Sequence, residues 1–235
     1  FMPTITIGLI LTSIAFLQIS PSFSFWTWAV GTAGHFLLTL YVVSSWVHHT
    51  RYDIKHLNPA WFIPVVGNIL VPVAGVSHAP IDVSWFFFSL GLFFWPVLMS
   101  IIFYRLLFHG SLPERFIPTL FILIAPPAVA LISWYKLTGS TGDFGRVMYG
   151  IALFFFVLIL FQAKYFVRLK FYLSWWAYSF PVAAMTIATL IMGEESGPGF
   201  YHVLAVGLLV CLAALVALLI ILTGINISPV SYTHL

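Results

Sequence analysis

Histidines are the residues of this 235-residue chain that first suggest chemistry, because imidazole binds metal ions and haem iron. His48 and His49 follow His35 by 13 and 14 residues, a separation that could stack two haems along one helix. Such a protein needs a second helix with a matching pair, and His78, His109 and His202 are isolated. His48, His49 and His56 are expected to lie in a loop. We therefore expect no haem, metal or other cofactor. His35 is interpreted as a hydrogen-bonded core residue.

Acidic and basic side chains are absent from the middle of every long apolar run. This argues against a proton pump and against a voltage sensor, since both carry ionisable groups inside the membrane. A pore lined by apolar and small side chains, closed sterically or by dewetting, is compatible with the pattern. The chain also lacks a G-x-S-x-G elbow, an H-E-x-x-H helix and a phosphate-binding loop, so we expect no enzymatic activity.

Phe180 has small neighbours at helical spacing, Ala177, Ala183 and Ala184, and Pro181 follows it directly. A large ring with space around it, beside a proline kink, could swing and plug a pore. The alternative is that Phe180 packs against a partner helix, as most phenylalanines in membrane proteins do. Residue types alone favour the packing interpretation.

The composition places these residues in a membrane. The chain is 62% hydrophobic and 6% charged, whereas soluble domains have about 25% charged residues. Crossing the hydrocarbon core takes roughly 20 apolar residues, and only helices satisfy the backbone of runs this long. The predicted fold class is therefore an all-α membrane protein with eight spans, at residues 2–19, 25–48, 59–78, 83–108, 116–137, 145–166, 173–193 and 199–224.

Basic residues predict the orientation of these spans. Seven of the nine lie in loops after even-numbered spans: Arg51, Lys55, Arg105, Arg115, Lys164, Arg168 and Lys170. The loops after odd-numbered spans hold the other two basic residues and four of the six acids. The positive-inside rule then predicts that the even loops and both ends of the chain are cytoplasmic. The net charge of +3 thus reports topology, and we expect no nucleic-acid partner.

Prolines divide the spans into two sets. Odd-numbered spans contain Pro3, Pro64, Pro72, Pro126, Pro127 and Pro181, whereas even-numbered spans contain only Pro96. Proline kinks a helix, and a kink is tolerated in a membrane where the disturbed backbone faces protein or a water-filled cavity. The pattern predicts helical hairpins repeated around an axis, with the kinked helix of each pair inside. The alternative is that proline is simply commoner in membrane helices.

Three motifs resemble the tellurite-resistance/dicarboxylate transporter family, which includes the plant slow anion channels. W-W-A-Y-S-F-P at 175–181 resembles the family's ninth helix, and A-P-P-A-V-A at 125–130 its seventh. N-P at 58–59, followed by V-V-G-N at 65–68, resembles the start of its fifth. The order and spacing agree from about residue 1 to residue 224.

The resemblance implies a trimer in which each protomer has ten helices, arranged as five hairpins around a central pore. Odd helices line the family's pore, and a phenylalanine that matches Phe180 occludes it. Our candidate pore-lining residues are Gly67, Asn68, Pro126, Pro127, Pro181 and Ala184. On this mapping the chain begins at the third helix, so we expect residues 1–225 to form one transmembrane domain that lacks its N-terminal part. Residues 226–235 are expected to be a non-native tail.

The leading functional hypothesis is a passive channel or exporter for small inorganic anions, such as chloride, nitrate or tellurite-type oxyanions, in a bacterial inner membrane. A proton-coupled carrier of C4-dicarboxylates or sulfite is the alternative, with His35 or His78 as its titratable group. A membrane enzyme or a scaffold is a third possibility, which no motif favours. The expected partners are small anions, the lipid bilayer and two further copies of the chain.

Overall fold

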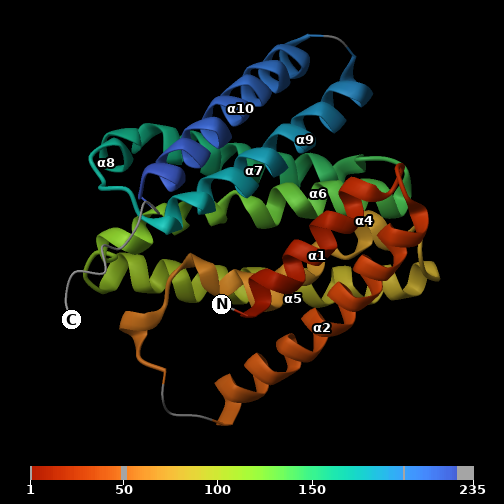
Figure 1. Cartoon of the computed structure of the whole chain (residues 1–235), viewed down its shortest axis with the longest axis horizontal. Coiled ribbons are helices and arrows are strands. Elements are labelled where there is room, and N and C mark those ends of the chain that lie inside the picture. The colour runs from red at the N-terminus through yellow and green to blue at the C-terminus, as the bar shows by residue number, and fades with distance from the viewer. Residues whose placement is uncertain (1, 49–51, 198, 227–235) are drawn as a thin grey trace.

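The described residues of the computed structural model, 2–48, 52–197 and 199–226, form helices and no strand (Figure 1). The all-α class is therefore confirmed. Three predictions fall outside the described residues: the loop positions of His49 and Arg51, and the tail after Asn226.

Each predicted span corresponds to one helical segment. Four segments are single long helices: α2 (Pro21–His48), α5 (Ile81–Phe108), α7 (Gly142–Phe161) and α10 (Phe200–Asn226). The first, α1, is shorter (Met2–Phe16). The other three are composite. The third segment consists of η2 (Pro59–Phe62), α3 (Ile63–Val66), η3 (Gly67–Leu70) and α4 (Pro72–Gly75). The fifth consists of η4 (Glu114–Leu123) and α6 (Ala125–Thr138), and the seventh of η5 (Leu173–Tyr178) and α9 (Ser179–Ser196). Two short helices, η1 (Ile54–His56) and α8 (Ala163–Val167), lie in connections.

The count of membrane-crossing helices differs from the prediction. Six of the described segments are long and apolar enough to cross a bilayer, whereas α1 and the composite segment at 59–75 are shorter. The second of these is divided into four pieces. Two of those pieces carry a proline in their first turn, Pro64 in α3 and Pro72 in α4, where its missing N–H is tolerated.

Prolines also explain why the fifth and seventh segments change helix type. The 3-10 helix η4 ends just before Pro126 and Pro127, and η5 ends just before Pro181. A proline cannot donate to the carbonyl four residues earlier, and its ring crowds the preceding turn. In both segments the backbone becomes regular α-helix just before the proline, at Ala125 and at Ser179.

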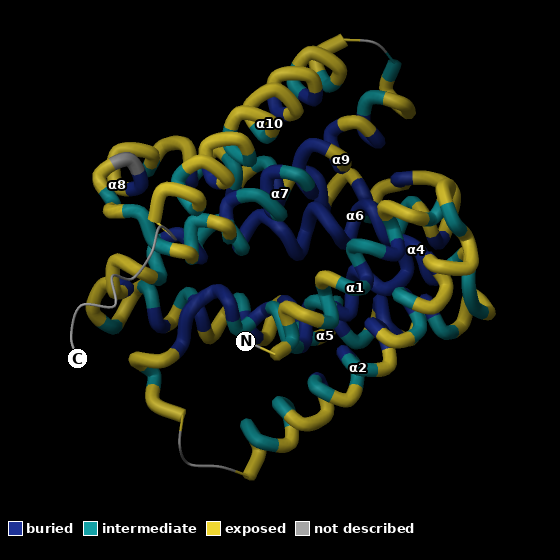
Figure 2. Tube along the Cα trace, in the orientation of Figure 1, coloured by how far each residue is buried: buried dark blue, intermediate teal, exposed yellow. Residues whose placement is uncertain are grey.

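Burial separates the segments into an inner and an outer set (Figure 2). In the most apolar 18-residue stretch of each span, 72% of residues are buried at 114–138 and 56% at 173–196. The same share is between 17% and 33% in α2, α5, α7 and α10. The three composite segments, 59–75, 114–138 and 173–196, are therefore enclosed by the straighter helices, which present apolar side chains outward as lipid-facing helices do. The helix α1, which contains Pro3, is exposed or half-buried instead, and only its Ile10 and Ser13 are buried.

Connections that follow even-numbered segments lie at one end of the molecule, and connections that follow odd-numbered segments lie at the other (Figure 1). The connection that carries η1, the α5–η4 loop and α8 lie at the left, whereas the α4–α5 and α6–α7 connections lie at the right. The left end thus holds most of the basic residues.

Candidate functional site

Segments that contain prolines line a cavity of about 540 Å³, which is partly open to the surroundings of the molecule. Its walls come from α1, from the composite segment at 59–75, from η4 and α6, and from η5 and α9. None of the outer helices α2, α5, α7 and α10 contributes to the lining described. Since one water molecule occupies about 30 Å³ in the liquid, the cavity has room for a small ion together with water.

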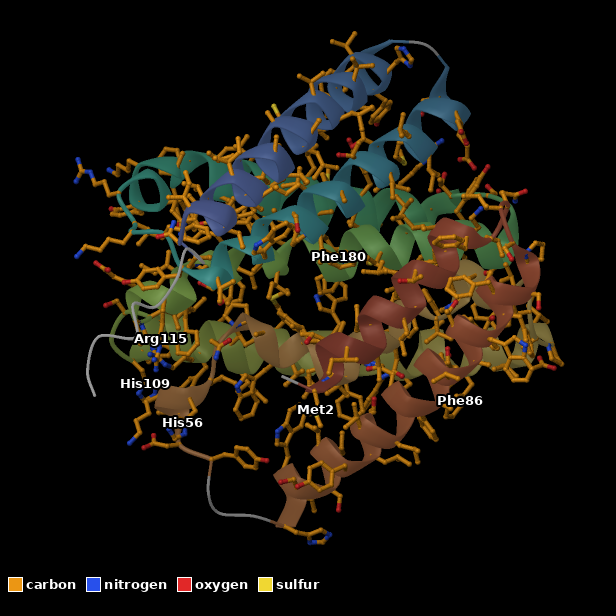
Figure 3. The ribbon with its side chains drawn as sticks, in the orientation of Figure 1. Met2, His56, Phe86, His109, Arg115 and Phe180 are labelled. Carbon is orange, nitrogen blue, oxygen red and sulfur yellow. The ribbon has the colours of Figure 1, made fainter. Side chains whose placement is uncertain are left out.

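Phe180 lines this cavity. It lies in the first turn of α9, directly before Pro181, and Figure 3 shows it at the centre of the molecule. Ser174 and Ala177, which precede Phe180 in the chain, also line the cavity. Residues three apart stand above one another in a 3-10 helix, so η5 and the start of α9 present Ser174, Ala177 and Phe180 as one row. The small side chain of Ala177 leaves room beside the ring.

The other predicted pore residues divide into two groups. Gly67, Pro126 and Pro181 line the cavity together with Phe180. Asn68, Pro127 and Ala184 are buried but are not part of the lining described; they lie behind the wall.

Asn68 has a role in the backbone of the composite segment. Its side-chain N–H donates to the carbonyl of Val65 at 2.7 Å and to the hydroxyl of Thr39 on α2 at 2.9 Å. The Thr39 hydroxyl in turn lies within donating distance of two carbonyls, that of Pro64 at 2.7 Å and that of His35 in its own helix at 2.9 Å. A broken helix exposes such carbonyls, and within a membrane the protein itself must satisfy them. Asn68 therefore holds the kinked segment against α2.

Part of the wall was not anticipated from the sequence. Thr4, Ile7 and Leu11 of α1 line the cavity, and their spacing of three and four residues places them on one helix face. The signal that could have predicted this face of α1 was that spacing, in a span that contains a proline. The residue types themselves are common on any membrane helix.

His35 is a buried core residue, in agreement with its interpretation from the sequence. Its Nδ1 lies 2.8 Å from the hydroxyl oxygen of Thr6, and that hydroxyl donates to the carbonyl of Pro3 at 2.9 Å. A hydroxyl has one proton, so when Thr6 donates to Pro3, His35 Nδ1 is the donor to Thr6. Nε2 is then an unprotonated acceptor, and it has no partner among the described residues. It adjoins Gly67, where a Cβ atom would lie 3.0 Å from Nε2.

Charged side chains lie near the cavity only at its ends. The guanidinium of Arg115 lies 4.9 Å from the centre of the Phe116 ring, and Phe116 lines the cavity. The described lining is otherwise apolar, apart from the hydroxyls of Thr4, Thr119 and Ser174 and the indole N–H of Trp176. A small anion in the middle of the cavity would thus meet no cationic side chain of the lining.

Family comparison agrees with this architecture. The family model described as voltage-dependent anion channel (SLAC1) matches residues 1–224. The chain belongs to this family. The resemblance to the slow anion channels is thereby confirmed, and the family is one of anion channels and transporters, not of enzymes.

Individual relatives come from plants and archaea. The chain is 31% identical over 192 residues to the S-type anion channel SLAH2 of Arabidopsis thaliana, which covers 79% of this chain and 37% of that protein. It is 26% identical over 209 residues to the uncharacterized transporter MJ0576 of Methanocaldococcus jannaschii, which covers 78% of this chain and 60% of that protein. The chain thus spans less than two thirds of the length of either relative.

Proposed function

We propose that the protein carrying this chain conducts small inorganic anions passively across a membrane, through the cavity that the proline-containing segments line. The observation that carries the proposal is the cavity lining, which comes only from the proline-containing segments within the described residues. Membership of an anion channel family supports the same conclusion. Chloride and nitrate are the anions we expect first, with tellurite-type oxyanions as further substrates.

Phe180 is the proposed gate. It lines the cavity with the small residue Ala177 on the same wall, and we propose that its ring rotates to open the pathway. The ring is only partly buried, although its helix lies in the inner set. A steric plug of this kind needs no ionisable group, which suits a cavity whose described lining has no acidic or basic side chain.

The test is the chloride or nitrate current of the full-length protein and of its Phe180→Ala variant, normalised to protein inserted in the membrane. Removing a plug should raise the current many-fold. If Phe180 only packs, truncation leaves a cavity that costs about 3–5 kcal/mol of stability and gives no gain in current. An unchanged or lower current from folded variant contradicts the gate.

Phe155→Ala is the matched control. Phe155 is buried on α7, outside the described cavity lining. Its truncation should cost a similar amount of stability without increasing the current. A rise in current in both variants would mean that loosened packing, not removal of a plug, opens the pathway.

A second candidate function is a proton-coupled carrier of C4-dicarboxylates or sulfite. The observation that favours it is His35, whose unpartnered Nε2 adjoins Gly67 in the cavity wall. Coupling requires a titratable group along the path. Uptake into vesicles that depends on a pH gradient in the wild type, and loses that dependence in His35→Gln, would support the carrier. A current that is independent of pH supports the channel.

The same proposal includes orientation and assembly. The end with η1 and α8 is expected to be cytoplasmic by the positive-inside rule, in a bacterial inner membrane. Apolar faces of outer helices can associate by close packing, and we propose a homotrimer. Mass analysis of the full-length protein in mild detergent should give three copies; a monomer at all concentrations would contradict this.

A further inference from the structure

Arg105 is a buried cation near the basic end of the molecule. Only 5% of its surface is exposed, although it lies in the last turn of α5, close to the loop that follows. Its Nη1 donates to the carbonyl oxygens of His109, at 2.9 Å, and of Gly110. These two bonds use both protons of Nη1 and hold the loop that leads into η4.

Among the described residues, no hydrogen bond to the opposite edge of the guanidinium is found, neither to the buried Nε nor to Nη2. Nε–H and Nη2–H are parallel donors, the arrangement that binds two oxygens of a planar anion or one halide. His109 Nε2, on the loop that Arg105 holds, is also buried and unpartnered.

No carboxylate side chain compensates the charge of Arg105. All six Asp and Glu residues lie in the described part of the chain, and the one ion pair found there joins Asp53 to Lys55. Glu114, the other acid near this end, accepts a hydrogen bond from the Tyr172 hydroxyl at 3.2 Å. Burying an unpaired charge is costly, so a bound anion would stabilise this arrangement.

The position of Arg105 relates it to the cavity. Its helix α5 packs against η2, whose Ala60 and Phe62 line the cavity, and the loop it holds leads to Phe116, which also lines it. His56, His109 and Arg115 lie at the same end of the molecule, on the left in Figure 3. This end therefore combines positive charge with access to the cavity wall.

We propose that Arg105 binds a small inorganic anion, chloride or nitrate, on the Nε–Nη2 edge at this mouth of the pathway. This inference rests on the proposed function for its role in conduction, but not for the binding itself. The bound anion neutralises the buried guanidinium and raises the local anion concentration at the mouth. The site thus matters most where anions are scarce.

Binding is tested directly with bromide. Crystals of the full-length wild-type protein soaked in bromide should show an anomalous peak in contact with the Arg105 guanidinium. No peak there, in crystals that show bromide elsewhere, overturns the inference. A lipid phosphate on this edge that bromide does not displace overturns it as well.

Conduction is tested with Arg105→Gln and with Arg168→Gln as the matched control, since Arg168 is an exposed cation at the same end. At about 10 mM chloride, where the Debye length is about 30 Å, each variant loses general attraction for anions. Arg105→Gln should lose about tenfold in conductance beyond the control, which corresponds to a charged hydrogen bond. The difference should disappear at about 1 M chloride, where the site is filled by mass action.

Arg105→Lys keeps the charge but not the parallel donors, and should lie between wild type and Arg105→Gln. Equal conductance of Arg105→Gln and Arg168→Gln at low chloride overturns the inference. If Arg105→Gln does not fold, the lysine variant and the bromide peak decide. A wild type without current but with bromide at Arg105 would refute the proposed channel and leave this site standing.

Discussion

The hydroxyl of Ser133 on α6 donates a hydrogen bond of 2.5 Å to the backbone carbonyl of Ile69 in η3. Both groups are fully enclosed, and the bond joins two of the segments that wall the cavity. Ile69 lies between the prolines of the composite segment, where the regular i to i−4 pattern of bonds is interrupted. Ser133 thus replaces a bond that an unbroken helix would make internally.

Ser133→Ala should therefore leave the Ile69 carbonyl buried and unsatisfied. The expected loss is about 1–3 kcal/mol in the free energy of unfolding, measured by thermal or denaturant unfolding in detergent. Ser100→Ala is the control, because the Ser100 hydroxyl bonds the Pro96 carbonyl on an exposed part of α5. A loss no greater than that of the control would show that Ile69 finds another donor.

The spans could be predicted from the sequence because their signal is local. Long apolar runs and the lack of charge define a membrane helix without reference to its neighbours. The inner set could be predicted for a similar reason, since a proline such as Pro64 or Pro126 disturbs its own backbone wherever it lies. Phe180 was found through its small neighbours and through a family motif.

Which side chains face the cavity could not be predicted in the same way. From Phe180, α-helical periodicity places Ala184 on the same face, yet the row that lines the cavity runs back through the 3-10 helix η5. Asn68 directly follows Gly67, and a change of helix type over such short pieces decides which of them faces the cavity. Helix type here depends on bonds from other segments, such as Thr39 to Pro64.

Cysteine labelling tests the proposed orientation. In a Cys211→Ser background, a cysteine introduced beside Arg168 should resist impermeant periplasmic thiol reagents, whereas one beside Glu194 should react. The reason is that basic loops are retained in the cytoplasm. Cys211 is removed because it is exposed on α10. Labelling in the opposite sense would reverse the orientation and move the Arg105 mouth to the other side of the membrane.

His78, in the connection between α4 and α5, should make stability sensitive to mild acid. Ser24 donates to the Ser13 carbonyl at 2.7 Å, so His78 Nε2 is the donor in the 2.8 Å bond to Ser24. Burial lowers the pKa of His78 below its usual value. Below about pH 6.5 the unfolded chain then binds a proton more readily than the folded protein, and stability falls.

The measurement for His78 is the difference in Tm between wild type and His78→Gln, from about pH 8 to about pH 5. The wild type should lose part of its advantage as the pH falls, since glutamine does not titrate. Carboxylates titrate in both proteins and cancel in the difference. A constant difference over this range would show that His78 titrates alike in the folded and unfolded states.

Gly91 on α5 approaches the same residue that Ser133 holds from α6. A Cβ atom at position 91 would lie 2.6 Å from Ile69 Cγ1, 2.7 Å from the Ile69 backbone nitrogen and 2.9 Å from the Val66 carbonyl oxygen. Two of these atoms belong to the backbone, so a side-chain rotation cannot relieve the contact. Glycine at this position is what allows α5 to pack directly against α3 and η3.

Gly91→Ala should therefore push the composite segment away from α5, at a cost of about 1–3 kcal/mol in unfolding free energy. Gly150→Ala on α7 is the matched control, because a Cβ there meets nothing and alanine favours the helix. Since Ile69 also lines the cavity, Gly91→Ala should in addition change the anion conductance of folded protein, whereas Gly150→Ala should not. Unfolding in detergent and single-channel currents of both variants check the two expectations. Equal stability and equal conductance of the two variants would show that the composite segment is free to shift, and that its clamping between α5 and α6 does not shape the pathway.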